Sequence, residues 1–176
     1  MKFKRMWDMP NANTFLIPSI GDFVSRHVFD SDVVVDPFAR GSSIGTITND
    51  LNPEYKTTFN MEARDFLQHL VETSVKADVV LFDPPYSPRQ ITECYSGIGL
   101  KAQQSDTQAS FYSEIKSLIR LIVKPGGKVL TFSWNSCRIH KDYSIEEIML
   151  VNHGGWHNDT ICTAQQSPIY LWEAYL

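Results

Sequence analysis

Hydrophobic positions along the chain follow two different periods, and the two kinds of segment alternate. Short runs of β-branched and aromatic residues predict buried strands, whereas apolar residues three and four positions apart predict amphipathic helices. The predicted strands cover residues 32–36, 44–50, 77–83, 128–133, 145–151 and 160–165, and the predicted helices cover residues 20–29, 63–75 and 110–123. This alternation is typical of an α/β protein whose sheet is largely parallel.

One predicted connection is shorter than a parallel sheet normally requires. The strand at 32–36 is followed almost directly by the strand at 44–50. A parallel crossover that contains a helix needs about ten or more residues. We therefore expect a shortened first crossover without a helix.

Length and composition limit the class of protein. A chain of 176 residues predicts one domain, 1–176, with one core. No apolar run approaches the roughly 20 residues that cross a bilayer, and residues 1–7 lack the apolar stretch of a signal peptide. The three cysteines, Cys94, Cys137 and Cys162, are too scattered to indicate disulfides or a zinc site. We expect a cytoplasmic protein with reduced thiols and no bound metal.

Acidic residues stand at the ends of three predicted strands. Asp36-Pro37-Phe38 ends the first, Asn49-Asp50 ends the second, and Asp83-Pro84-Pro85-Tyr86 ends the third. In parallel sheets the carboxyl ends of the strands share one edge, and ligands bind there. The sequence therefore predicts one ligand site formed by these three strand ends.

The turn Asp83-Pro84-Pro85-Tyr86 suits methyl transfer to an exocyclic amino group. The lone pair of such a nitrogen is delocalised into the base, so hydrogen bonds that favour a pyramidal nitrogen activate it. The Asp83 carboxylate accepts one N–H bond, and the Pro84 carbonyl remains an acceptor although proline has no N–H. Two prolines stiffen the turn, and Tyr86 offers a ring on which a flipped base stacks.

The alternative interpretation of the Asp83 to Tyr86 turn is purely structural: a strand that ends in a Pro-Pro turn with an aspartate cap. Its place directly after an apolar strand, together with the second acidic strand end at Asp36, favours the catalytic interpretation. Asp50 has a similar pair of interpretations. It either accepts from both hydroxyls of a ribose or caps the turn before Asn52, and its strand-end position favours the ribose.

These motifs resemble those of a known family. Asp83-Pro84-Pro85-Tyr86 resembles the catalytic motif of amino-methyltransferases, in particular the DNA adenine-N6 type, and Asp36-Pro37-Phe38 with Gly41 resembles their cofactor motif. The whole run, through residues 124–128 and 153–160, is similar to small methyltransferases carried by phages and integrative elements of bacteria. The resemblance implies a Rossmann-like class I fold with seven strands, mostly parallel with an antiparallel edge strand, S-adenosylmethionine as the methyl donor, and adenine in DNA as the acceptor.

The resemblance also implies roles for individual residues. The catalytic residues are those of one turn: Asp83, Pro84, Pro85 and Tyr86. The cofactor contacts come from the segments around the first strands and the helix that follows: Thr14, Phe15, Ile17, Asp36, Pro37, Phe38, Gly41, Asp50, Asn52, Asp65 and Asp83. Asp83 belongs to both sets because the methyl group and the base meet there.

A long polar connection, 87–107, follows the predicted catalytic turn. Long loops inside compact domains are often functional, although a surface loop with incidental charges is equally compatible with this composition. We expect the loop to close over the flipped base, with substrate contacts from Arg89, Gln90, Tyr95 and Lys101.

Recognition of nucleic acid is the open part of the interpretation. The net charge is −4, and no stretch is long enough for a separate target-recognition domain. Homodimerisation, which the apolar segment 169–176 suggests, or a partner protein would supply the missing affinity. Methylation of RNA or of another base amino group, and a non-catalytic module that binds nucleic acid or a partner, remain alternatives.

His153 and His157 do not predict a metal site, because Gly154-Gly155 between them argues against a helix.

Overall fold

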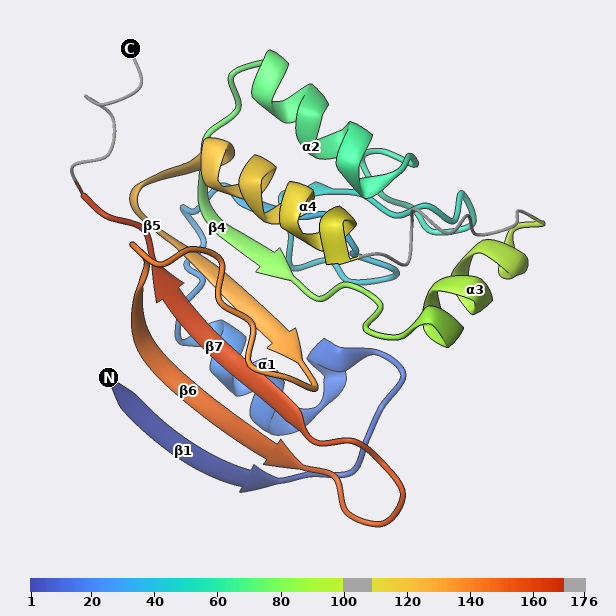
Figure 1. Ribbon diagram of the computed structural model, residues 1–176, viewed down its shortest axis with the longest axis vertical. Coiled ribbons are helices and arrows are strands. Elements are labelled where there is room, and N and C mark those ends of the chain that lie inside the picture. The colour runs from blue at the N-terminus through green and yellow to red at the C-terminus, as the bar shows by residue number, and fades with distance from the viewer. Residues whose placement is uncertain (100–108, 170–176) are drawn as a thin grey trace.

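The computed structural model describes residues 1–99 and 109–169, which form a single seven-stranded sheet (Figure 1). The strands are β1 (Lys2–Trp7), β2 (Val34–Asp36), β3 (Ile47–Thr48), β4 (Ala77–Phe82), β5 (Val123–Ser133), β6 (Ser144–Asn152) and β7 (Thr160–Gln166). Their order across the sheet is β1-β6-β7-β5-β4-β2-β3. Strand β7 runs antiparallel to both of its neighbours, and the other pairs are parallel.

Helices lie on both faces of this sheet. They are α1 (Pro18–Ser25), which follows a short 3-10 turn η1 (Thr14–Leu16), and α2 (Ala63–Glu72), α3 (Pro88–Gly97) and α4 (Ala109–Ile122). Figure 1 shows α2 and α4 side by side on one face, α1 on the opposite face, and α3 beyond the end of β4. Among the described residues, no helix is both long and apolar enough to span a membrane.

Successive side chains of the central strands point to opposite faces of the sheet, so each face has its own hydrophobic core. In β4, Val79 and Leu81 pack toward α1, whereas Val80 and Phe82 pack toward α2 and α4. All four side chains are buried, and each contributes roughly 1.5–3 kcal/mol through removal of apolar surface from water. A strand buried on both faces shows a continuous apolar run, which is why the sequence identifies β4 clearly.

The predicted fold class is confirmed, including the shortened first crossover. Residues 37–46, all of them described, join β2 to β3 through turns without a helix. The predicted strand 44–50 is regular only at Ile47–Thr48. Asn49 still donates its backbone N–H to the Asp36 carbonyl at 2.8 Å, and its side chain holds the segments on either side. The side-chain amide donates to the Pro37 carbonyl at 3.1 Å and to the Met61 carbonyl at 3.0 Å. The antiparallel strand lies inside the sheet rather than at an edge, because β6 and then β1 add outside β7.

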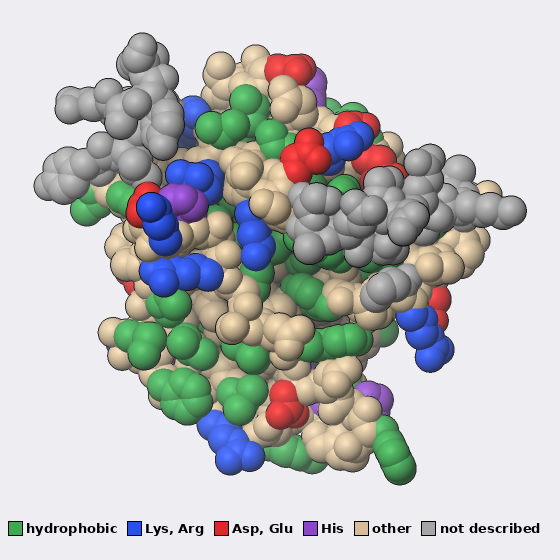
Figure 2. Space-filling model, in the orientation of Figure 1, with side chains coloured by type: hydrophobic (Ala, Val, Ile, Leu, Met, Phe, Trp, Pro, Cys, Tyr) green, Lys and Arg blue, Asp and Glu red, His purple; other side chains and the backbone are tan. Residues whose placement is uncertain are grey.

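Two elements differ from the sequence-based expectation. The pattern does not predict strand β1, because all six of its residues are exposed and show no buried period. Figure 2, in the orientation of Figure 1, shows hydrophobic side chains over the part of this face where β1, β6 and β7 lie.

The expectation of a loop over residues 87–107 is wrong for Pro88–Gly97, which is helix α3. Proline suits the first helical position, and Ser87 Oγ caps the helix by accepting from the Gln90 N–H at 3.1 Å.

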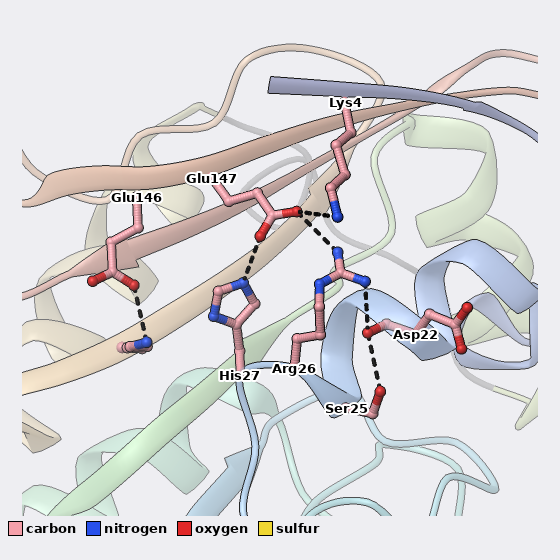
Figure 3. Close-up of polar contacts among 8 residues, drawn as sticks. Lys4, Asp22, Ser25, Arg26, His27, Glu146 and Glu147 are labelled. Carbon is pink, nitrogen blue, oxygen red and sulfur yellow. Dashed lines mark hydrogen bonds and ion pairs between the residues drawn. The ribbon is translucent and has the colours of Figure 1, made fainter. Parts of the chain in front are cut away.

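A buried carboxylate fastens α1 to the outer strands (Figure 3). Glu147 in β6 is 4% exposed and accepts from Arg26 Nη2 at 2.9 Å; His27 Nε2 lies at 3.3 Å and Lys4 Nζ at 3.8 Å. Burial raises the pKa of Glu147, but the hydrogen bonds and charges of Arg26, His27 and Lys4 outweigh burial and hold the pKa below its ordinary value. The carboxylate is therefore charged and fully compensated.

Candidate active site

A cavity of about 620 Å³ opens at the carboxyl ends of the parallel strands. Its wall combines the turns after β2 and β4, the segment before α1, helices α3 and α4, and the turn between β6 and β7. Cavities of this size accommodate ligands as large as a nucleoside derivative. The position agrees with the general rule that ligands of open α/β sheets bind beyond the strand ends.

Asp83 lies in the cavity wall directly after β4. Burial raises the pKa of the Asp83 carboxyl to about 6, while hydrogen bonds from Thr14 and Tyr86 and the charge of Arg40 oppose the rise. The group is therefore mostly ionised at pH 7, and it is a better proton acceptor than a carboxylate in water.

The Pro-Pro turn after Asp83 is held by two helices. The Pro85 carbonyl accepts a hydrogen bond from the Tyr112 hydroxyl of α4. The Tyr86 N–H donates to Gln90 Oε1 of α3 at 2.8 Å. The Tyr86 ring lies 6.3 Å from the Trp134 ring at an angle of 44°. These contacts hold the turn that follows Asp83 and place the Tyr86 and Trp134 rings in the cavity wall.

The other two strand-end acids have different surroundings. Asp36 is fully buried behind the cavity; its Oδ1 accepts from the Phe38 N–H at 3.1 Å, and its Oδ2 has no partner among the described residues. Burial raises the pKa of Asp36 to about 8, opposed by the Phe38 hydrogen bond and reinforced by the nearby charges of Asp83 and Asp50. Asp36 is therefore largely protonated at pH 7.

Asp50 lines the cavity and also caps its own turn. Its Oδ2 accepts from the Arg40 N–H at 2.9 Å, and its Oδ1 accepts from the Asn52 N–H at 2.8 Å. Each carboxylate oxygen accepts more than one hydrogen bond, so these contacts leave acceptor capacity toward the cavity. The two interpretations of Asp50 are compatible with each other.

Most of the residues that the sequence singled out meet at this cavity. Those in its wall are Thr14, Ile17, Pro37, Phe38, Asp50, Asn52, Asp83, Pro84, Pro85, Tyr86, Gln90 and Tyr95. They come from segments far apart in the chain, which agrees with the prediction that the strand ends form one site.

Five predicted site residues lie elsewhere, and a sixth falls outside the described residues. Phe15 packs edge-on against Phe132, with ring centroids 5.1 Å apart, Asp36 lies behind the wall, and Gly41 is outside the lining. Asp65 lies on the outer side of α2 beside Arg64, because Phe66, Leu67 and Leu70 direct the other side of that helix into the core. The Arg89 side chain is 87% exposed and pairs with Glu93 at 2.8 Å. Lys101 is outside the described residues.

Two cavity residues are absent from the sequence interpretation. Arg40 adopts a positive φ of 49° and donates to the Ala12 carbonyl at 2.6 Å, which brings its charge near Asp83. The sequence signal for Arg40 is its place directly before Gly41, inside the segment that resembles the cofactor motif. Glu62 lines the wall three residues before Asp65 and accepts from the Tyr95 hydroxyl at 2.7 Å. No sequence spacing connects Glu62 with Tyr95.

His153 holds the turn between β6 and β7 against the segment after β1. Its Nδ1 lies 2.9 Å from the Asp8 carbonyl and its Nε2 lies 2.9 Å from Thr160 Oγ1. Both ring nitrogens are therefore engaged, and the residue has a structural role at the cavity rim. Within residues 1–99 and 109–169, no cluster of three His, Cys, Asp or Glu side chains could hold a metal ion.

Comparisons with known proteins show the fold. No family model matches the sequence, and no curated protein matches it. TrmN from Thermus thermophilus is 16% identical, with a TM-score of 0.57 over 86% of this chain and 49% of that one. SMU.776, described as a methyltransferase complexed with SAH, is 9% identical, with a TM-score of 0.51 over 76% and 45%. A protein described as an rRNA methylase from Clostridium thermocellum is 9% identical, with a TM-score of 0.54 over 90% and 100%.

The chain spans about half the length of TrmN and of SMU.776. At these sequence identities the likeness concerns the fold alone. The chain has the Rossmann-like fold of class I methyltransferases, with the antiparallel strand inside the sheet.

Proposed function

We propose that this protein is an S-adenosylmethionine-dependent methyltransferase that acts on the N6 amino group of adenine in DNA. The observation that carries this proposal is the turn Asp83-Pro84-Pro85-Tyr86 in the wall of the strand-end cavity, with its carboxylate fixed by Thr14 and Tyr86. Asp83 also favours adenine, because the related cytosine-N4 enzymes more often carry serine there.

The cavity residues fit the proposed cofactor. Asp50 and Asn52 supply acceptors and donors for the ribose hydroxyls, and Pro37, Phe38 and Ile17 supply an apolar wall. The bound cofactor would supply an electrophilic methyl group on a sulfonium. Its positive charge would lie close to Asp83, which further favours the ionised carboxylate.

Asp83 then prepares the acceptor. Its carboxylate would accept a hydrogen bond from one N–H of the adenine amino group, and the Pro84 carbonyl would accept the other, which would make the nitrogen lone pair available. Transfer of the methyl group that the cofactor would supply on its sulfonium would place a positive charge on the nitrogen. Asp83 would receive the proton that the nitrogen releases, which its raised pKa favours.

A base amino group in RNA is the second candidate. The rRNA methylase from Clostridium thermocellum has a similar fold over its whole length. The same arrangement of acceptors would serve an exocyclic amine in either nucleic acid, so the acceptor has to be identified by product analysis.

The test is nucleoside mass spectrometry of DNA and RNA after incubation with the protein and S-adenosylmethionine. We expect N6-methyladenine in DNA from the wild type and none from Asp83→Asn. Asp30→Asn, an exposed acid in the loop after α1, is the matched control and retains activity. Methylated RNA alone would select the second candidate, and absence of S-adenosylhomocysteine binding in calorimetry would refute both.

A further inference from the structure

The edge strand β1 presents exposed aromatic and basic side chains that the cavity does not use. Phe3 is 65% exposed and Trp7 is 64% exposed, although they belong to a regular strand. Residues 1–7 carry Lys2, Lys4 and Arg5 and no acidic residue, whereas the whole chain has a net charge of −4. Exposed apolar surface of this kind usually marks an interaction site.

The register of β1 against β6 separates its side chains into two sets. Lys4 faces α1 and the buried Glu147, as does its partner position Met149. Phe3, Arg5 and Trp7 therefore share the opposite face, next to Ile148, Leu150 and Asn152. The bond from Arg5 Nε to Asn152 Oδ1 at 2.5 Å agrees with this arrangement. Over β1 and β6, no described helix covers this face (Figure 1).

This aromatic face of β1, defined by Phe3, Arg5 and Trp7, continues into the cavity rim. The Trp7 indole lies against the turn between β6 and β7, since a Cβ added at Gly154 would meet Trp7 Nε1 at 3.4 Å. His157 in that turn lines the cavity, and so does Pro10, three residues after Trp7. A chain lying along β1 would therefore reach the cavity without a gap in the surface.

We propose that the aromatic face of β1 binds a single-stranded segment of the nucleic-acid substrate and leads it to the cavity. Phe3 and Trp7 are four residues apart on one side of a strand, about 13 Å, which gives unpaired bases two separate rings to stack on. Arg5 between them, on the same face, supplies positive charge for the phosphates. Stacking requires unpaired bases, so the surface selects single strands over duplex.

The observations favour this occupant over a second copy of the chain. A free edge strand can pair with its own copy, but antiparallel pairing of two β1 strands would bring the cations of both copies close together. A polyanionic strand neutralises those same cations. The Asp159 carboxylate on this side is already bound to Asn152 Nδ2 at 2.5 Å and to the His153 N–H at 3.3 Å.

This inference rests on the proposed function, because it takes the cavity as the site of the target base. Its test measures binding directly, by fluorescence anisotropy of a labelled 20-nucleotide single-stranded DNA without S-adenosylmethionine, and of the same sequence as RNA and as duplex DNA. We expect the double variant Phe3→Ala/Trp7→Ala to weaken single-strand binding by about tenfold or more. Phe29→Ala removes an exposed phenylalanine of similar exposure beside α1 and is the matched control.

The charge contribution has a separate readout. For wild type, the logarithm of the binding constant falls as the logarithm of salt concentration rises. Arg5→Gln is expected to flatten that slope by about 0.7 for each phosphate that the variant no longer neutralises. Calorimetry with S-adenosylhomocysteine should give the same affinity for wild type, Phe3→Ala/Trp7→Ala and Arg5→Gln, which shows that the cavity is intact.

Three results would overturn the inference: unchanged single-strand affinity in Phe3→Ala/Trp7→Ala, duplex binding tighter than single-strand binding, or a dimer in light scattering that the same substitutions dissociate. Binding of single-stranded nucleic acid without any methyl transfer would refute the proposed function but would still support the binding surface on β1. Methyl transfer without β1-dependent binding would refute the surface alone.

Discussion

The two ends of the sheet bury carboxylates in opposite ways. Glu147, on the outer strand β6, is surrounded by Arg26, His27 and Lys4, and its pKa is lowered. Asp36 and Asp83, at the carboxyl ends of β2 and β4 on the other side of the sheet, have pKa values that burial raises to about 8 and about 6, although Thr14, Tyr86 and Arg40 partly oppose the rise at Asp83. Both regions belong to the same sheet, so the difference reflects what surrounds each carboxylate.

This contrast separates an acid that links structural elements from acids whose raised pKa values are of the kind found at reactive sites. A compensated carboxylate holds elements together but has little tendency to accept a proton. A buried carboxylate whose hydrogen bonds and neighbouring charges only partly offset its burial lowers the stability of the folded chain and is more basic, and strongly shifted pKa values of this kind concentrate at functional sites. The predictions below test the contrast at each of these acids.

The largest expected effect is on methyl transfer by Asp83→Asn. Asparagine has a similar shape, but its amide cannot receive a proton and presents N–H donors where the base needs an acceptor. We expect the transfer rate to fall by about 10²–10⁴, with little change in S-adenosylhomocysteine affinity. Single-turnover transfer of a labelled methyl group measures the first, and calorimetry measures the second. A rate within a few fold of wild type would remove Asp83 from the mechanism.

The wild-type reaction should itself depend on pH. Only ionised Asp83 accepts both the hydrogen bond and the proton, and its pKa is about 6. We therefore expect kcat/KM to fall by about tenfold per pH unit below 6 and to level off above 7. A profile that stays flat down to pH 5 would contradict this assignment.

Glu147→Gln tests the compensated end of the sheet. A lowered folded-state pKa means that ionised Glu147 contributes stability at neutral pH, and that this stability is lost as pH falls through the folded pKa. We expect the substitution to reduce the free energy of unfolding by roughly 1–3 kcal/mol at pH 7, with a smaller difference at pH 4. Urea denaturation at both pH values measures it. Glu146→Gln, which removes a more exposed pair with Lys128, should cost less than about 1 kcal/mol.

Asp36→Asn should behave in the opposite way. The folded-state pKa of Asp36 is about 8, so wild-type stability falls as pH rises from the ordinary aspartate range toward 8. Asparagine keeps the acceptor for the Phe38 N–H and does not ionise. Between pH 5 and pH 8 we expect the variant to gain roughly 3–4 kcal/mol in the free energy of unfolding relative to wild type. Urea denaturation of both proteins at pH 5 and pH 8 measures this gain. If the ionisation of Asp36 did not affect stability, the difference between variant and wild type would be the same at the two pH values.

The parts of the fold that bury a regular face are predictable from the sequence. Strands β4 and β5 and helices α2 and α4 have clear apolar periods, and the acidic strand ends converge as expected. Strand β1 has no buried face, so no period reveals it. In α3 the helix signal at Ser87 and Pro88 directly follows a Pro-Pro turn, so the polar composition of the segment indicates a loop instead.

The candidate site is predictable at the residues that directly follow strands. Asp83 to Tyr86 and Asp50 fall into this group. Arg40 and Glu62 interact with residues distant in the chain, Arg40 with Asp83 and Glu62 with Tyr95. Only the folded structure shows these interactions. Asp65 lies outside the cavity wall for a related reason, since the direction of a helical side chain depends on which face of the helix packs on the core.

The pairing of β1 with β6 sets an order of events during protein synthesis. Arg5 bonds to Asn152, which lies 147 positions later, so the first strand has no partner until nearly all of the described chain has left the ribosome. At about 5–20 residues per second this wait lasts roughly 7–30 seconds. During that interval the nascent chain carries an unpaired strand with a phenylalanine and a tryptophan, a ready target for chaperones. The lysines and arginine interleaved with those rings are the kind of residue that keeps such a strand from aggregating while it waits.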